Sequence, residues 1–328
     1  MMPTLMKFSS LFSQPRLIAA AFLVSGTASI ALAQNTTERL IDLRPKLEKG
    51  QEIRYEMRTE TTTSYKAGDA GTLVFDGSSK IQQQLDLKLK VIESDTEKGS
   101  TVELLVERVV ARLETDGTAI NFDSAKPQSP RNADQNDTRA LEAFAKMAGS
   151  SVLIQIEPSG RIASISAPST LPGAGSHSAL TNAGLGGLMS VPGGIGIPFG
   201  EILSMGHPTG LVKPRETWTN TDTLGGLGMN MITTHRLKSS TSTTAKVSIS
   251  GKIEPPASQG QGAGSSAKAR SKASEQSEPI KAFTYEGEYD WDTQRGQLNK
   301  LDVRTEFKYD NPPLVYETRM TSAVRRVR

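Results

Sequence analysis

Hydrophobic and polar residues alternate with a period of two along much of this chain. Near the start of the pattern, Ile53, Tyr55 and Met57 hold one set of positions, and charges of alternating sign from Glu52 to Glu60 hold the other. Successive side chains of a β-strand point to opposite faces of a sheet. The pattern therefore predicts a half-buried strand whose charged stripe is the wet side, so that any ligand should be sought on the other side.

The same alternation recurs further along the chain. It fills residues 85–91, and a polar loop containing Gly99 then leads into an apolar run at 101–114. A second pair of predicted strands, 152–157 and 161–166, flanks a Pro-Ser-Gly turn. These segments predict antiparallel hairpins.

One segment has helical spacing instead. Leu141, Phe144, Ala145 and Ala148 share a face if the chain is helical, and Gly149 can end the helix. The sequence thus predicts a mainly β protein: a curved antiparallel sheet or half-barrel of about ten to twelve strands. A single helix, at about 137–149, would pack on its concave face.

Two long inserts interrupt the pattern. Residues 168–200 are rich in Gly, Pro and small side chains, and we expect a flexible loop there. Residues 255–279 are polar and of low complexity, which is typical of disorder. Because strand-like alternation resumes directly after the second insert, we expect it to interrupt a hairpin rather than to separate domains.

The two halves of the chain share a loose order of motifs. A Leu-x-Lys start, a breaker, a Glu and an aromatic residue precede a Thr-rich strand at Leu47 and again at Leu211. Two hairpin-like segments follow in each half. An internal duplication is one hypothesis, and the general similarity of β-hairpins is the alternative.

The N-terminus has the features of a secretory signal. Lys7 and Arg16 precede an apolar run, and Ala31-Leu32-Ala33 supplies small residues at a cleavage site. The run is shorter than the roughly 20 residues that cross a bilayer, so we favour a cleaved signal over a membrane anchor. We predict a signal peptide at 1–33 and a single β-rich domain at 34–328, with no transmembrane span after cleavage.

Composition narrows the compartment and the partners. The chain contains no cysteine, which excludes disulfides and thiolate metal sites and favours the periplasm or exterior of a bacterium. Removal of Lys7 and Arg16 with the signal lowers the net charge from +3 to about +1. The basic residues are interleaved with acids, so nucleic acid is not an expected partner.

Candidate chemistry is sparse. None of the three histidines, His177, His207 and His235, has metal-ligand spacing to another. Ser159 lies in a turn without a nucleophile motif, and the glycines of 184–196 lack a G-K-[ST] sequence. We therefore predict no catalytic, cofactor-binding or metal-binding residues, and no cofactor.

One predicted strand carries four acidic residues at alternate positions: Glu286, Glu288, Asp290 and Asp292. This stripe could meet a cation or a basic partner, and the simpler interpretation is pairing with bases opposite, such as Arg304 and Lys308. The other face of the strand carries Phe283, Tyr285, Tyr289 and Trp291, which we expect in the core.

Several motifs taken in order resemble an uncharacterised family of exported bacterial β-rich proteins, a domain of unknown function. They are LRPKLEKGQEIRYEMRTETTT, LKLKVIESDTEKGSTVELLVERV, PSGRIASI, KPRETWTNTDTL and YDWDTQRGQLNKL. This sequence has Pro214-Arg215 where such proteins more often have a Gly and an acid. The resemblance implies no activity and no catalytic residues. A weaker similarity, in architecture alone, is to lipoprotein-carrier-like folds.

These observations favour an exported, non-catalytic envelope protein that binds an apolar or lipid-like molecule in the concave face of the sheet. The first insert carries apolar residues that could contact such a ligand: Leu180, Leu185, Leu188, Met189, Ile195, Ile197 and Phe199. One alternative is a structural or scaffold protein of the envelope that binds a protein partner. A hydrolase of unknown substrate is the third.

Overall fold

The structure is a computed structural model, and it describes residues 40–67, 75–126, 141–142, 144–166, 208, 210–224, 229–254, 280–311 and 314–327. The predicted signal at 1–33 and both predicted inserts lie outside these residues. So do residues 137–140 at the start of the predicted helix. Glu38–Arg328 groups as one compact unit, within which all the strands lie.

The described chain forms one antiparallel sheet of twelve strands, which confirms the predicted fold class. The first six strands are β1 (Glu52–Ala67), β2 (Phe75–Asp95), β3 (Gly99–Thr115), β4 (Thr118–Asp123), β5 (Ser151–Ile156) and β6 (Ile162–Ser166). The remaining six are β7 (Thr217–Leu224), β8 (Met229–Ser240), β9 (Thr244–Glu254), β10 (Ile280–Asp292), β11 (Gln297–Asn311) and β12 (Leu314–Val327).

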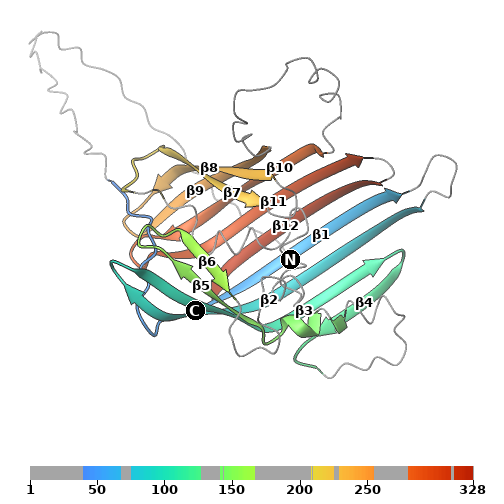
Figure 1. Cartoon of the computed structure of the whole chain (residues 1–328), viewed down its shortest axis with the longest axis horizontal. Coiled ribbons are helices and arrows are strands. Elements are labelled where there is room, and N and C mark those ends of the chain that lie inside the picture. The colour runs from blue at the N-terminus through green and yellow to red at the C-terminus, as the bar shows by residue number, and fades with distance from the viewer. Residues whose placement is uncertain are drawn as a thin grey trace, which may run out of the picture. The chain divides into compact units, whose positions relative to one another are not determined.

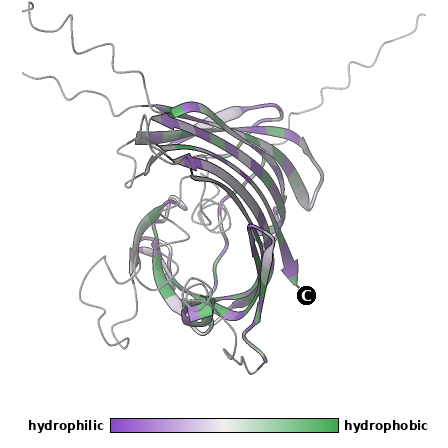
Figure 2. Ribbon diagram, turned by 90° about the vertical axis from the view of Figure 1, so that its right-hand side faces the viewer, coloured by the Kyte–Doolittle hydropathy of each residue, from purple (hydrophilic) through white to green (hydrophobic). Residues whose placement is uncertain are grey.

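The first strand lies beside the last, in the middle of the sheet (Figure 1). The order is β6-β5-β3-β2-β1-β12-β11-β10-β9-β8-β7, and β4 pairs with β3 off this path. Each half of the chain is thus an antiparallel meander, and the pairing of β1 with β12 joins the two. Within the described residues β6 and β7 are opposite edges that do not pair, so the curved sheet remains open (Figure 2).

The period-two pattern accounts for the two faces. Ile53, Tyr55 and Met57 of β1 are at most 6% exposed, whereas Arg54 and Arg58, at the alternate positions, are exposed. We call the face that carries Ile53, Tyr55 and Met57 the core face and the opposite one the polar face. Charges on the polar face pair across strands, as in the 3.2 Å contact between Arg54 Nε and Glu107 Oε2. The opening stripe is therefore the wet side of the sheet, as predicted.

The helical segment ends two residues earlier than predicted. Residues 141–142 and 144–147 are helical, and Gly149, with φ of 78°, follows them. Phe144 and Met147 are buried against the core face, where the Phe144 ring lies 5.8 Å from that of Phe122. Ala145, expected on the packed face, is exposed. Met147 takes its place because the segment turns directly into β5, where Val106 N donates to Ser150 O.

Residues 40–50, which we call the strap, cross one end of the core face. Ile41 pairs with Val212 ahead of β7, and Lys46 Nζ donates to the Thr293 carbonyl in the β10–β11 turn. Gly50 N then donates to Val91 O of β2. Leu43 of the strap is 1% exposed and belongs to the hydrophobic core, so the strap closes this end of the core face with apolar side chains.

Residues 255–279 connect two paired strands. β9 pairs with β10 from Tyr285↔Gly251 to Asp292↔Thr244, so the insert does interrupt a hairpin. β2 and β3 pair as predicted, as do β5 and β6. The shared meander order does not test a common origin of the two halves, which stays a prediction.

Candidate binding face

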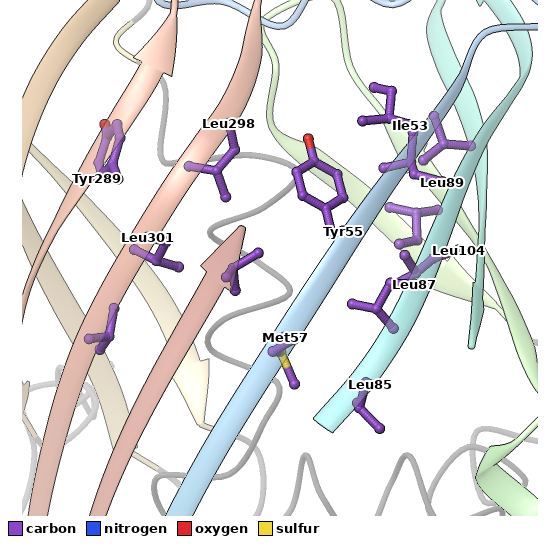
Figure 3. Close-up of a cluster of buried hydrophobic side chains, with 14 of the residues drawn as sticks. Ile53, Tyr55, Met57, Leu85, Leu87, Leu89, Leu104, Tyr289, Leu298 and Leu301 are labelled. Atoms are coloured by element: carbon purple, nitrogen blue, oxygen red, sulfur yellow. The ribbon is translucent and has the colours of Figure 1, made fainter. Parts of the chain in front are cut away.

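The core face changes in character along the strands, and its base, next to the strap, is apolar. Met57, Leu85 and Leu301 are fully buried here, and Figure 3 shows side chains from β1, β2 and β11 gathered into one cluster. The residues that are opposite Met57 in register, from strand to strand, form a continuous row across eight strands, which we call the level of Met57. They are Val109, Leu85, Met57, Val324, Leu301, Tyr289, Val247 and Leu237. This base is a filled core.

Above the base, the central strands carry hydroxyl groups on the same face. This hydroxyl zone consists of Thr59, Thr61, Thr63, Thr233, Thr305, Thr318 and Ser322. Thr59 Oγ1 lies 3.4 Å from Ser322 Oγ, and Thr63 Oγ1 lies 3.2 Å from Thr318 Oγ1. Such cross-strand pairs satisfy hydroxyls without charge. The Thr-rich run of β1 therefore supplies a polar but neutral stretch of the core face.

The far end of the core face, which we call the rim, is aromatic and half-buried. Tyr65 of β1, Tyr316 of β12 and Tyr309 of β11 are opposite one another in register. The rings of Tyr309 and Tyr316 stack with centroids 5.1 Å apart, and Phe307 packs against Tyr316. Some apolar residues at the levels of the hydroxyl zone, such as Ile81 opposite Thr61, are also half-buried. The core face thus grades from buried at its base to partly accessible at its rim.

Two buried polar atoms of the core face have no hydrogen-bond partner within the described chain: His235 Nδ1 and Thr305 Oγ1. His235 is fully buried on β8, between Trp218, stacked at 5.5 Å, and Tyr289, edge-on at 6.2 Å. Its Nε2 lies 3.2 Å from Thr233 Oγ1. Burial lowers the pKa of His235 to about 4, so the ring is neutral at neutral pH.

A cavity of about 1560 Å³ lies at the level of Thr59, where the apolar base gives way to the hydroxyl zone. Its lining includes the core-face residues Thr59, Gln83 and Ser322 and the polar-face residues beside them, such as Arg58 and Arg304. On β8 only polar-face positions contribute: Thr234, Arg236 and Lys238. The lining is therefore mixed, with acids and bases in similar number.

A largely buried ion pair, between Arg326 and Asp292, lies next to the apolar base of the core face. Tyr55 and Arg326 are opposite in register, which places Arg326 on the core face. Arg326 Nη1 donates to Gln297 Oε1 at 2.7 Å and Nη2 to Asp292 Oδ2 at 3.3 Å. Asp292 Oδ1 also accepts from the backbone N–H groups of Gln294 and Arg295. This cluster ties β10, β11 and β12 together next to the strap.

The acidic stripe of β10 is engaged by neighbouring strands. Glu288 pairs with Lys238 of β8, and Asp290 lies 3.7 Å from Lys246 of β9. Asp292, the last residue of β10, contacts Arg326 of β12 instead, next to a register shift at which Asn299 of β11 is the extra residue. The basic partners, Lys238 and Lys246, differ from the expected Arg304 and Lys308.

Arg304 is opposite Glu286 in register but forms its own ion pair with Glu306. A partner for the acidic stripe outside the chain stays a prediction.

Other predicted residues have varied outcomes. The seven apolar residues of 168–200 lie outside the described residues, as do His177 and His207. Tyr285, Tyr289 and Trp291 are buried as predicted. His235 was not expected as a core residue, although its alternation with Thr233 and Leu237 in β8 carries that signal.

The part of the chain that the structure describes holds no group of three or more His, Asp or Glu side chains able to hold a metal ion. Across the same residues, no helix has the length and apolar character needed to cross a membrane.

No protein-family model matches the chain, and no curated protein matches it as a relative. Among solved structures, it is similar to lipovitellin, in a structure of its lipid–protein interactions, with 9% identity and a TM-score of 0.47. That alignment covers 86% of this chain and 26% of lipovitellin, so the chain spans about a quarter of that protein.

Weaker similarities are to an outer membrane channel from Pseudomonas putida F1 and a DUF1329 family protein from Desulfovibrio piger. The channel has 7% identity and a TM-score of 0.27, with 86% of this chain and 97% of the other covered. The Desulfovibrio protein has 9% identity and a TM-score of 0.12, with 82% and 85% covered. These similarities are too weak to assign a function.

Proposed function

We propose that this is an exported, non-catalytic envelope protein that binds an apolar or lipid-like molecule on the core face of its curved sheet. The observation that carries the proposal is the gradient along that face. The base is filled with apolar side chains, whereas apolar and aromatic groups above it stay half-buried: Ile81 and Phe283 beside the hydroxyl zone, and Tyr316 at the rim. Membership of the uncharacterised exported family belongs to the same proposal.

A single-layered open sheet explains why such groups are available. A sheet with one apolar face normally buries it against a second layer. Within the described residues, the layer over the core face consists of the strap and one short helical turn, which cover the base and the β2–β4 side. The rim of β1, β11 and β12 therefore offers apolar contacts that an acyl chain can use.

The test is binding of an apolar fluorescent probe and of brominated lipid to the purified protein. The chain has two tryptophans, half-buried Trp218 and Trp291 at the buried base, both on the core face. We expect brominated lipid to quench Trp218 more than Trp291, with the Trp218→Phe variant separating the two signals. Native mass spectrometry after incubation with membrane extract should retain lipid.

A matched pair of neighbouring substitutions gives the control. Ile81→Asn changes a half-buried core-face residue, and Gln82→Asn changes its exposed polar-face neighbour, which donates to Glu60. We expect the first to weaken probe binding about tenfold and the second to leave it unchanged. Equal, negligible effects of both, with no lipid retained, would remove the proposal.

The second candidate function is a scaffold for a protein partner, and the charged polar face is the surface that favours it. Many of its charges already pair with one another, as Lys80 does with Glu60 at 3.0 Å and Lys300 with Asp302 at 2.8 Å. Such pairs suit a solvated surface as well as an interface. Crosslinking in cells that recovers one protein and no lipid would favour the scaffold.

A further inference from the structure

The two unpartnered polar atoms of the core face point to the kind of molecule that binds there. Thr305 is 1% exposed and His235 is fully buried, and both side chains project from the core face. A buried donor or acceptor without a partner is costly, and most such groups in proteins are hydrogen-bonded. Thr59, Thr63, Thr318 and Ser322 in the same zone meet this requirement with each other.

The charge of the surroundings limits what can bond to them. From the level of Met57 to that of Tyr65, no described core-face position of β1, β2, β3 or β8–β12 carries an Asp, Glu, Lys or Arg, and His235 is neutral. On the edge strand β7, Asp222 is opposite the core-face residue Met231 in register. Arg326, the charged residue beside the apolar end of the core face, is already paired with Asp292. An ionised head group placed here would lose its hydration without meeting a counter-charge.

The two atoms also accept different bonding arrangements. A threonine hydroxyl both donates and accepts. His235 Nδ1 is a donor or an acceptor depending on whether Nε2 accepts from or donates to Thr233 Oγ1. Hydroxyl and ester oxygens suit such a site, because neither needs a fixed charge opposite.

We infer that the ligand is a neutral lipid, and that Thr305 and His235 hydrogen-bond its hydroxyl or ester oxygens while its chains lie along the apolar core face. This inference rests on the proposed function and names its ligand class. The two residues lie on β11 and β8, three strand spacings apart and two residues out of register, which is roughly 16 Å along the sheet. Because the oxygens of one glycerol ester lie close together, Thr305 and His235 each contact an oxygen of a separate ligand molecule.

The experiment compares three probes that share a chain: hexadecane, hexadecanol and hexadecanoate at pH 8, each competing with an apolar fluorescent dye. We expect hexadecanol to bind at least about fivefold more tightly than the other two. Thr305→Val and His235→Phe should each weaken one of two hexadecanol sites about three- to tenfold and leave hexadecane binding unchanged. Thr321→Val, on the exposed polar face of β12, is the matched control and should change neither.

Folding is checked separately for each variant. Thr305→Val replaces the hydroxyl by a methyl group of similar shape. If the Thr305 hydroxyl has no partner in the ligand-free protein, we expect the Tm of this variant to be unchanged or raised. A lowered Tm, with hexadecanol affinity unchanged, would show an internal partner or water only and would overturn the inference.

The proposed function and this inference fail in different ways. Tight and equal binding of hexadecane, hexadecanol and hexadecanoate would keep the apolar site and reject the neutral-lipid assignment. Binding of none of the three probes would remove both.

Discussion

Arg326 of β12 and Asp292 of β10 form an ion pair across β11, with 3.3 Å between Arg326 Nη2 and Asp292 Oδ2. Their side chains are only 17% and 10% exposed. Burial raises the pKa of Asp292, but the Arg295 backbone N–H and the Arg326 guanidinium outweigh it, and the net pKa is lowered. The carboxylate thus stays ionised beside the strap.

We predict that Arg326→Met destabilises the protein strongly. Removing Arg326 leaves the largely buried Asp292 carboxylate with Arg295, at 3.4 Å, and two backbone N–H groups as its remaining partners, which we expect to cost roughly 1–3 kcal/mol in the free energy of unfolding. Arg304→Met is the control, because the pair of Arg304 with Glu306 is exposed and should contribute less than about 1 kcal/mol. Urea denaturation measures both, and equal small losses would contradict the assigned role of Arg326.

A second prediction concerns acid. Two hydrogen bonds from Arg108 to Asp123, at 2.9 and 3.1 Å, and one from the Ala125 N–H lower the pKa of Asp123 to about 2. A lowered carboxyl pKa stabilises the fold above the unfolded-state value of about 4 and loses that effect as the pH falls toward 2. Asp123→Asn should therefore lower Tm at pH 7 and have little effect at pH 2. A Tm difference independent of pH would contradict this.

His235 also makes the fold less stable in acid, but because burial disfavours its charged form. Its pKa falls to about 4 on burial, whereas the unfolded chain has a histidine pKa of about 6.5. Below pH 6.5 the unfolded state binds the proton first, so stability is lost as the pH falls from about 6.5 to 4. The loss amounts to roughly 2–4 kcal/mol.

His235→Phe should flatten that part of the stability curve. Proton NMR of the wild type should show one histidine ring that stays neutral to about pH 4. A titration of all three rings near pH 6.5 would rule out a buried His235.

The sequence predicts local features of this fold better than its long-range pairing. The alternation at Ile53, Tyr55 and Met57 indicates which side chains are buried, because successive residues of a strand point to opposite faces of the sheet. Nothing local in β1 or β12 indicates that Arg54 is opposite Val327, more than 270 residues away in the chain. Non-local pairing depends on the whole meander, in which the two halves meet at β1 and β12.

The candidate site shows the same limit. The sequence predicts that Tyr289 and Trp291 are core residues, and they are. It does not predict the partners of Asp292, because Arg326 comes from β12, two strands away across a register shift in β11. The buried His235 likewise depends on Trp218 of the adjacent strand, which stacks on its ring. Bulges and cross-strand stacking are decided by packing, which a period-two pattern does not record.

Gly99, at the start of β3, provides the final prediction. Its φ is 90°, and a Cβ placed there would lie 2.0 Å from the Ile156 carbonyl oxygen of β5. Gly117 between β3 and β4 has a φ of 85° but open space around it. Alanine at either position meets the left-handed backbone penalty of roughly 1–2 kcal/mol.

Only Gly99→Ala must also push β5 away from β3, because the clash is with backbone. We expect Gly99→Ala to lower the free energy of unfolding by clearly more than Gly117→Ala does, and hydrogen exchange to show loss of protection in β5 and β6. Equal losses for the two variants would mean that β5 does not approach Gly99 this closely.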